Sequence, residues 1–418
     1  MTVLVLHHRS SLAACPYPQW LAGYDGDVVL IASREHLGWV GEDLPTGDDH
    51  GYRHMEAIDD YEVGGVLEER VLELARKYDV KHIFTFQEHD LERAAQLREL
   101  LGLPGQTLES AIPFRNKLVM KQIVEAAGIE VAPHAPVECA ADLLVFAERH
   151  GFPVVVKPRD GAGSIGVKVL NDSTELNAFL DEDLDIYGPL QSNLMVEAFV
   201  PGSMAHVDGL VVDGEVVFSW PSQYLFQLAS FKEERGGRHD VTMDQDDPLA
   251  QRMIDFVDRV IDALPAPPNF VFHCEVFRTP DDRLVLCEIA GRTGGAQTRA
   301  VIQTLFGVEL NECWLRADVG LPLPVDTANG RLQPAKMTGQ LVLGKRPGKV
   351  LAVRGEPPFD WVERQKVFVE VGEVMPVPRY SADFMAAYLV SGPDRATVQN
   401  RLNELETWFF DGLVLGDE

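Results

Sequence analysis

The feature that most constrains this chain is a pair of β-rich runs joined by a short turn, within residues 270–299. The turn Pro280–Arg283 suits a strand reversal, because proline presets φ and aspartate tolerates left-handed backbone. If the turn is centred on its two aspartates, Glu275 and Glu288 face each other across the paired strands. Directly opposed like charges destabilise a strand pair. A divalent cation with oxygen ligands is the simplest group to lie between them, so we predict a metal there.

A second group of residues follows this hairpin. Arg292 and the pair Gly294–Gly295 place a cation and flexible backbone beside the two carboxylates. A cation, a metal and mobile backbone at one place are what the transfer of a phosphate group needs. The hairpin and its continuation therefore predict a site that moves phosphate.

Composition places the chain among acidic globular proteins built from several packed units. The chain has 418 residues, which is more than a single hydrophobic core accommodates. Its 65 acidic and 37 basic residues give a formal charge of −28. Nucleic acid is not an expected partner, because phosphate contacts need clustered Lys and Arg. A membrane is not expected either, because no apolar run reaches the roughly 18–20 residues that span a bilayer. The five scattered cysteines fit a reducing cytoplasm.

Residues 1–112 alternate short β-branched runs with helices, which predicts a parallel sheet. Residues 66–78 and 91–101 are the expected helices, since their apolar residues recur at helical spacing. Ligands of such sheets bind beyond the carboxyl ends of the strands. Glu88 follows the run 82–86 at such a position, and it is either a substrate-facing residue or a solvated turn residue.

A lysine followed by a glycine-rich loop gives a second phosphate signal. The strand 153–158 carries Lys157 near its end, and a loop through Ser164 and Gly166 leads to the strand 167–170. Exposed N–H groups of such a loop can approach phosphate closely. The loop by itself is also typical of a plain flexible turn, and the adjoining lysine favours the phosphate interpretation.

Two later segments have less definite patterns. Residues 232–240 combine two adjacent glycines with several charged groups and no periodicity, so we expect a mobile loop or lid there. The tail has short β runs, including 367–371, and a final helix, 396–408. It shows no catalytic constellation, and we expect it to pack the molecule and to contribute to the back of the active site.

The order of these elements resembles the ATP-grasp superfamily. Lys117, then Lys157 with its glycine loop, then the segment 197–200, then the paired glutamates and Arg292–Gly295 follow one another in that family's order and spacing. Each motif alone is loose, but five in this order are specific. The resemblance covers the chain from end to end, and the sequence looks like the carboxylate–amine ligase branch, which includes L-amino-acid ligases.

The resemblance implies a multidomain α/β and α+β protein with the ATP-grasp fold. The expected parts are an N-terminal parallel α/β domain (1–112), a linker helix with a small α+β lid (113–200), an antiparallel α+β catalytic half (201–325) and a β-rich C-terminal extension (326–418). ATP would lie between the lid and the catalytic half.

The resemblance also implies roles for single residues. Glu275 and Glu288 match the carboxylates that hold Mg²⁺, with Mn²⁺ as the alternative metal, and Arg292 matches the cation that stabilises an acyl-phosphate. Lys117 and Lys157 match phosphate-contacting lysines. The remaining ATP contacts would be the closing loop and a hinge strand that meets adenine mostly through backbone groups, namely Ser164, Ile165, Gly166, Glu197, Ala198, Phe199 and Val200.

Two positions depart from the family's pattern. The family commonly has Asn two residues after the second glutamate, and this chain has Ala290. Metal binding would then rely on the glutamates, phosphates and water, and Mg²⁺ readily keeps several waters. A ribose-binding acid often follows the Pro-Gly at 201–202, where this chain has Ser203–Met204. His206 or Asp208 is the expected substitute.

The implied function is an ATP-dependent carboxylate–amine ligase. It would form an amide or peptide bond through an acyl-phosphate and release ADP and phosphate, with Lys157 and Arg292 neutralising charge. Its partners would be a small-molecule carboxylate and amine in the cytoplasm, and family analogy suggests a homodimer. The alternatives are an ATP-grasp carboxylase or formyl-type enzyme, and a non-catalytic ATP-binding regulatory protein.

Two sets of substrate-facing candidates keep two interpretations each. Arg235 and His239 either recognise a carboxylate or the acyl-phosphate, which makes His239 a catalytic candidate, or are exposed loop charges. Thr293, Gly294 and Gly295 either cradle the acceptor carboxyl with backbone N–H groups or form a sharp turn that needs glycine. Both interpretations of the second set can hold together.

Overall fold

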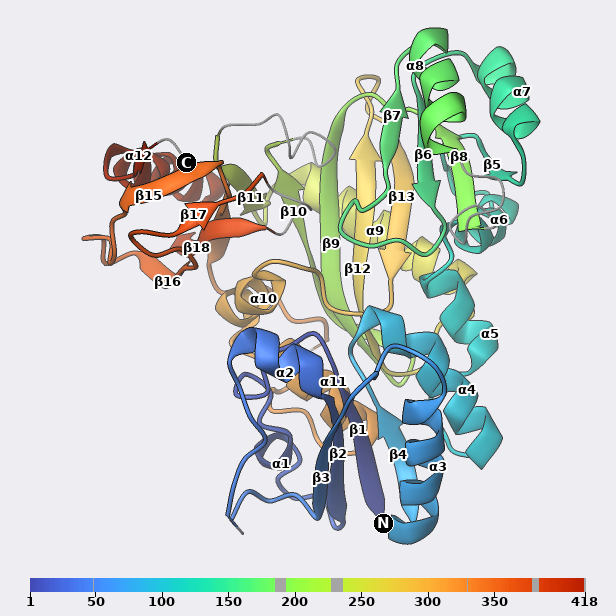
Figure 1. Cartoon of the computed structure of the whole chain (residues 1–418), viewed down its shortest axis with the longest axis vertical. Coiled ribbons are helices and arrows are strands. Elements are labelled where there is room, and N and C mark those ends of the chain that lie inside the picture. Colours follow the sequence, from blue (N-terminus) through green and yellow to red (C-terminus); the bar gives the residue numbers. More distant parts are fainter. Residues whose placement is uncertain (48, 185–192, 227–235, 329, 378–382, 417–418) are drawn as a thin grey trace.

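The N-terminal part is a four-stranded parallel sheet with helices packed on it (Figure 1). The computed structural model describes residues 1–47, 49–184, 193–226, 236–328, 330–377 and 383–416. The sheet order is β3-β2-β1-β4. The elements are β1 (Thr2–His7), α1 (Tyr17–Trp20), β2 (Asp27–Ser33), α2 (Arg34–Val40), β3 (His54–Ile58), α3 (Val66–Tyr78), β4 (Val80–Phe84), α4 (Leu91–Leu101) and α5 (Leu108–Ala111). The predicted parallel sheet and both predicted helices are confirmed, and β3 is an additional strand.

A second, smaller sheet is antiparallel and has the order β5-β8-β6-β7. The elements of this part are α6 (Lys117–Ala126), β5 (His134–Val137), α7 (Ala140–His150), β6 (Val154–Pro158), β7 (Lys168–Leu170), α8 (Ser173–Ala178) and β8 (Leu194–Ala198). Phe146 of α7 and Leu176 of α8 share an apolar core with Val154 and Val196 of the sheet. The glycine-rich loop connects β6 to β7, so the sheet holds both ends of that loop.

The largest sheet has eight antiparallel strands in the order β13-β12-β9-β10-β11-β14-β18-β16. The elements are β9 (Ser203–Val212), β10 (Glu215–Tyr224), β11 (Arg238–Thr242), α9 (Pro248–Ala263), β12 (Phe270–Arg278), β13 (Leu284–Ala290), α10 (Thr298–Phe306), α11 (Leu310–Asp318), β14 (Met337–Gly344), β16 (Val362–Val367) and β18 (Phe384–Gly392). The β12–β13 hairpin pairs Glu275 with Glu288 as predicted, although the register next to the turn is one residue off the expected one and shifts between Glu275 and Val276. Val257 of α9 and Cys274 and Val276 of β12 lie in one apolar core.

The tail contributes strands to this same sheet, because β14, β18 and β16 extend it beyond β11. The rest of the tail is β15 (Gly348–Ala352), β17 (Val374–Met375), α12 (Arg395–Asp411) and β19 (Val414–Gly416), of which the three strands form a separate sheet. The prediction of a strand at 367–371 is wrong beyond Val367, because β16 ends there and β17 begins at Val374. Leu402 and Phe409 of α12 pack in a second apolar core with Leu341 of β14.

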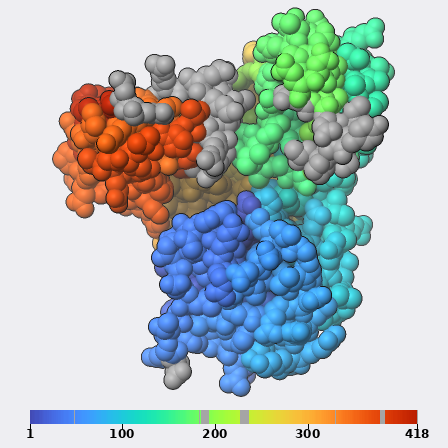
Figure 2. Space-filling model, viewed as in Figure 1, coloured from blue at the N-terminus to red at the C-terminus, as the bar shows by residue number. Residues whose placement is uncertain are grey.

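The parts surround a common centre. Figure 2 shows the N-terminal part in blue, the small sheet in green and the tail in orange as three lobes of one face. Within the described ranges, no helix has the length and apolar character needed to cross a bilayer.

Candidate active site

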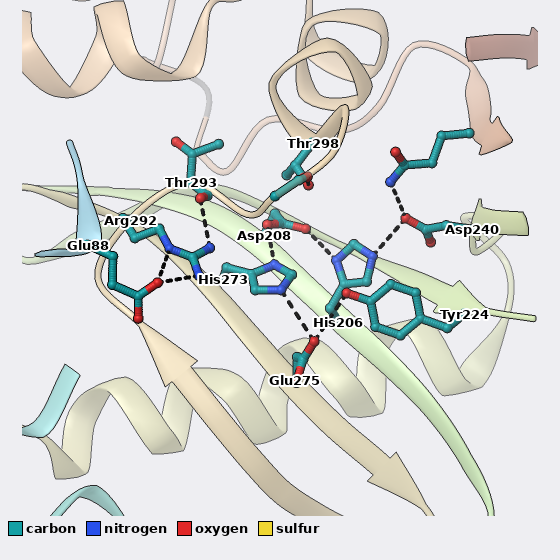
Figure 3. A network of polar contacts seen from close by, with 12 residues as sticks. Glu88, His206, Asp208, Tyr224, Asp240, His273, Glu275, Arg292, Thr293 and Thr298 are labelled. Atoms are coloured by element: carbon teal, nitrogen blue, oxygen red, sulfur yellow. Dashed lines mark hydrogen bonds and ion pairs between the residues drawn. The ribbon is translucent and has the colours of Figure 1, made fainter. Parts of the chain in front are cut away.

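The large sheet has one polar face, and this face lines a cavity of about 550 Å³. Side chains alternate along a strand, so β12 directs His273 and Glu275 to the cavity and Cys274 and Val276 into the apolar core. Figure 3 shows the polar side chains that β9, β10 and β11 place beside those of β12. The small sheet and its glycine-rich loop line the same cavity.

Glu275 and Glu288 lie opposite each other in register, and both line the cavity. The Tyr224 hydroxyl donates to Glu275 Oε1 at 3.2 Å, and Lys117 Nζ lies 3.1 Å from Glu288 Oε2. Burial opposes ionisation of Glu275, but the hydrogen bond and charge of His273 hold its pKa below the usual range. Two facing carboxylates at a cavity wall are oxygen donors of the kind Mg²⁺ prefers, so these residues fit a bound magnesium ion.

Lys157 is held by a buried ion-pair cluster. Its Nζ lies 2.6 Å from Glu197 Oε1, and Lys121 Nζ lies 3.2 Å from the other oxygen of the same carboxylate. Burial opposes the charge of Glu197, but the two lysines, Lys121 first, hold its pKa at about 2. Lys121 also donates to the Leu286 carbonyl at 3.2 Å, which links α6 to β13. Lys121 was not predicted, although its position four residues after Lys117 places both on one face of α6.

The glycine-rich loop has left-handed backbone at three positions. Gly163 and Ser164 have φ of 63° and 60°, and Gly166 has φ of 76°. The Ile165 and Val167 N–H groups donate to carbonyls of the loop itself, at 3.3 Å each. Lys117 Nζ donates to the Gly161 carbonyl at 2.5 Å, which ties α6 to this loop.

Most predicted ATP contacts line the cavity. They are Lys117, Lys157, Ser164, Ile165, Glu197, Ala198, Phe199 and Val200. Gly166 is part of the loop but is not among the lining residues, and neither is Asp208. The helix, the loop and the hinge strand therefore meet at one place, although they lie up to eighty residues apart in the sequence.

Arg292 is oriented by Glu88. Glu88 Oε2 accepts hydrogen bonds from Arg292 Nε at 2.8 Å and Nη2 at 2.6 Å (Figure 3). Arg115 Nη1 donates to Glu88 Oε1 at 2.6 Å. Burial opposes ionisation of Glu88, but Arg292 and Arg115 hold its pKa at about 2. Both oxygens of Glu88 are therefore engaged. Arg292 lines the cavity, whereas Glu88 and Arg115 are not among the residues that line it.

The two glycines after Arg292 differ in their surroundings. A Cβ on Gly294 would lie 2.6 Å from His273 Nδ1 and 2.7 Å from Thr298 Oγ1, whereas a Cβ on Gly295 would meet nothing within 4 Å. Gly294 is thus required for a close approach of backbone to side chains. Thr293 Oγ1 donates to Asn311 Oδ1 at 2.5 Å, and of Thr293, Gly294 and Gly295 only Gly295 lines the cavity.

Asp208 lies between two histidines and is not among the residues that line the cavity. His206 Nδ1 is 2.5 Å from Asp208 Oδ2, and His273 Nδ1 is 2.9 Å from Asp208 Oδ1 (Figure 3). Burial lowers the pKa of His273, but the Asp208 charge outweighs it and raises that pKa to about 9. The carboxylate oxygens are therefore satisfied inside the protein. His206 and His273 come from neighbouring strands, β9 and β12, far apart in sequence.

His239 lies outside the cavity. It is part of β11, and its Nε2 is 2.6 Å from Glu406 Oε2 of α12. His239 is not among the residues that line the cavity, so the structure does not support its catalytic candidacy. The prediction of a mobile loop is wrong for residues 238–240, because β14 pairs with β11 and Glu406 contacts it. Arg235 lies outside the described residues.

Comparison with known proteins identifies the class of this fold. Residues 150–300 match the family model described as ATP-grasp domain. An L-amino acid ligase from Bacillus licheniformis has a TM-score of 0.76 at 18% identity, over 100% of this chain and 98% of that one. A phosphoribosylglycinamide synthetase from Anaerococcus prevotii has a TM-score of 0.67 at 15% identity, over 100% and 99%. The chain thus has the ATP-grasp fold, and the predicted fold class is confirmed.

Curated relatives match over parts of their length. An L-arginine-specific L-amino acid ligase of Bacillus subtilis is 27% identical over 279 residues, which are 65% of this chain and 65% of that protein. A D-alanine–D-alanine ligase of Geobacter sulfurreducens is 33% identical over 109 residues, 25% of this chain and 33% of that protein. The chain therefore spans less than two thirds of each of these two relatives.

Proposed function

We propose that this protein is an ATP-dependent carboxylate–amine ligase acting on amino acids. The observation that carries this function is the facing pair Glu275 and Glu288, with Lys157 and Arg292 lining the same cavity. A metal held by the two glutamates, together with Lys157 and Arg292, would neutralise the negative charge that develops when a carboxylate attacks a phosphate. The named relatives that join amino acids support the same class of reaction.

The residues divide the chemistry between them. The substrate carboxylate attacks the γ-phosphate of ATP, ADP leaves, and an amine then displaces phosphate from the acyl-phosphate to form an amide. Glu275 and Glu288 would hold Mg²⁺, which neutralises phosphate oxygens when bound. Lys157, kept charged and oriented by Glu197, and Arg292, oriented by Glu88, neutralise the charge that remains.

The parts of the fold have matching roles in this proposal. We infer that ATP lies between the small sheet and the large sheet, with the loop of residues 161–166 over its phosphates. This position excludes water, which otherwise hydrolyses an acyl-phosphate. The five cysteines are free, which fits a reducing cytoplasm. We also propose, by analogy with the family, that two copies of the chain associate as a homodimer.

Release of phosphate tests the proposed function. The purified protein is incubated with Mg-ATP and pairs of amino acids, phosphate is measured, and the products are analysed by mass spectrometry. The proposal expects ADP, phosphate and a product whose mass is the sum of two substrates minus water. Phosphate release that depends on bicarbonate or formate, and not on amino acids, would replace it with a carboxylating or formyl-type function. Absence of ADP across the panel would indicate a regulatory protein.

A further inference from the structure

The cavity continues past the residues expected to contact ATP. Arg238 and Asp240 of β11, Gln340 and Val342 of β14, and Phe384 of β18 line it as well. In sheet order β11 lies three strands from β12, which carries Glu275, and three strand spacings are about 14 Å. The wall formed by these strands is therefore separate from the predicted metal position.

Asp240 is anchored in this wall through one of its two oxygens. Its Oδ2 accepts hydrogen bonds from His206 Nε2 at 3.0 Å and Gln340 Nε2 at 2.7 Å (Figure 3). Gln340 is fixed in turn, because its Oε1 accepts from the Gln297 N–H at 3.0 Å. Burial lowers the pKa of His206, but the charges of Asp240 and Asp208 outweigh it and raise that pKa well above its ordinary value. The orientation of the Asp240 carboxylate is thus set by two donors.

The other oxygen of Asp240 has no donor among the described residues. Asp240 is 4% exposed, and Oδ1 is buried without a hydrogen-bond partner there. A buried carboxylate oxygen without a donor is costly, and native structures rarely leave one unsatisfied. Glu197 Oε2 is also buried without a hydrogen-bond partner among these residues, but Lys121 Nζ lies 3.2 Å from it, so that oxygen faces a cation.

The charges around Asp240 suit an organic ligand better than a metal ion. Arg238 lies two residues earlier on the same strand, so both side chains are on one face of β11. Both residues line the cavity, and the Arg238 guanidinium lies 5.6 Å from the centre of the Phe226 ring. A wall with both signs of charge complements an amino acid, which carries an ammonium and a carboxylate.

We propose that Asp240 Oδ1 accepts a hydrogen bond from a protonated nitrogen of the amino-acid substrate, in a subsite built where the tail strands join the large sheet. This inference rests on the proposed function. The nitrogen belongs either to the α-ammonium group or to a cationic side chain. Asp240 binds substrate directly, while His206 and Gln340 are positioning residues that orient its carboxylate.

Calorimetric titration in the presence of Mg-ADP tests the subsite without turnover. The probes are the twenty standard L-amino acids and, for each that binds, the acid of the same skeleton without its α-amino group. Asp240→Asn should weaken amino-acid binding by about ten- to a hundredfold, because a charge-assisted hydrogen bond is lost. If the α-ammonium is the donor, every amino acid that binds is weakened and the acid without the amino group is not. If a side chain is the donor, only arginine, lysine and histidine are weakened.

Matched measurements keep the result interpretable. Asp246→Asn removes the same charge from an exposed aspartate outside the cavity lining, and it should leave every affinity unchanged. Mg-ADP affinity and the thermal midpoint of Asp240→Asn report whether the variant is folded. If Asp240→Asn does not fold, Gln340→Leu serves in its place. This variant removes one donor to the Asp240 carboxylate and should weaken the binding of the same amino acids.

The outcomes separate this inference from the proposed function. Unchanged amino-acid affinity in folded Asp240→Asn, equal weakening of the acids without the amino group, or no amino acid bound by the wild type would overturn the subsite. Amide formation by the wild type would leave the proposed function standing in each of these cases. Amino-acid binding that depends on Asp240 without any amide product would overturn the function and leave the subsite.

Discussion

Replacing Arg292 by alanine removes a cation from the wall of the cavity that the predicted metal pair also lines. Its guanidinium is bound to Glu88 through two hydrogen bonds of 2.8 and 2.6 Å, so its position is fixed before substrate arrives. A preorganised donor of this kind stabilises the charge that develops in the transition state, and losing one typically costs about 10²–10³ in rate. That range corresponds to about 2.7–4 kcal/mol.

The fold should survive this substitution. Glu88 keeps Arg115 as a partner at 2.6 Å, so its buried carboxylate is not left unpaired. We therefore expect a loss of about 1–3 kcal/mol in the free energy of unfolding, the range for a lost hydrogen bond to a charged group. Arg292→Lys keeps the charge but loses the planar fork, and its activity should lie between those of the wild type and the alanine variant.

The assay is phosphate release at saturating Mg-ATP with varied amino acid, which gives kcat and KM separately. Arg283→Ala is the matched control, because Arg283 is an exposed arginine at the turn of the same hairpin and does not line the cavity. It should turn over like the wild type. Normal kcat/KM in a folded Arg292→Ala variant would refute the assignment of the site.

Three further predictions follow from single contacts. Glu288→Gln should weaken Mn²⁺ binding in the presence of ADP, because it removes one of two facing carboxylates. Electron paramagnetic resonance measures this binding, and unaltered binding would place the metal elsewhere. Gly294→Ala should lower the thermal midpoint, because its Cβ would lie 2.6 Å from His273 Nδ1, whereas Gly295→Ala, with nothing within 4 Å, should not; equal midpoints would contradict the predicted clash. The pKa of Glu88 is about 2, below its ordinary value of 4.5, so its stabilisation is present above pH 4.5 and lost as pH falls toward 2. In Glu88→Gln the difference in unfolding free energy between pH 7 and pH 3, from urea titration, should be smaller than in the wild type by about 2 kcal/mol; an unchanged difference would mean that Glu88 is not paired in solution.

The opposition of Glu275 and Glu288 was predicted, but the turn alone does not produce it. Next to the turn, Val276 pairs with Leu286 and Arg278 with Leu284, one residue off the register expected from the turn, and an irregularity between Glu275 and Val276 restores the expected register. The helices of the N-terminal part were equally predictable, because α3 and α4 keep a helical spacing of apolar residues.

The polar cluster of the large sheet could not be derived in the same way. Asp208, His273 and Asp240 belong to strands brought together only by the sheet order β12-β9-β10-β11. Residues 236–242 carry no alternation that predicts a strand, and β11 forms by pairing with β10 on one side and with β14, about a hundred residues later, on the other. Contacts between residues so far apart in the sequence depend on tertiary structure. For this reason, the sequence pattern alone predicted a loop at His239.

Lys121 is an intermediate case. It lies on α6, and its spacing of four from Lys117 places the two lysines on one face of that helix. The sequence did not show that this face is buried against Glu197 and the Leu286 carbonyl. A buried lysine needs a partner. The partner of Lys121 is Glu197, which tertiary structure brings to it from the small sheet.

Transfer of oxygen from the substrate carboxylate tests the central claim most directly. An amino acid labelled with ¹⁸O in both carboxyl oxygens is incubated with Mg-ATP and an amine substrate, and the phosphate is analysed by mass spectrometry. Attack of the carboxylate on the γ-phosphate requires one labelled oxygen in the phosphate and one in the new amide. Phosphate without label, or turnover without an amide, would contradict a ligase that acts through an acyl-phosphate.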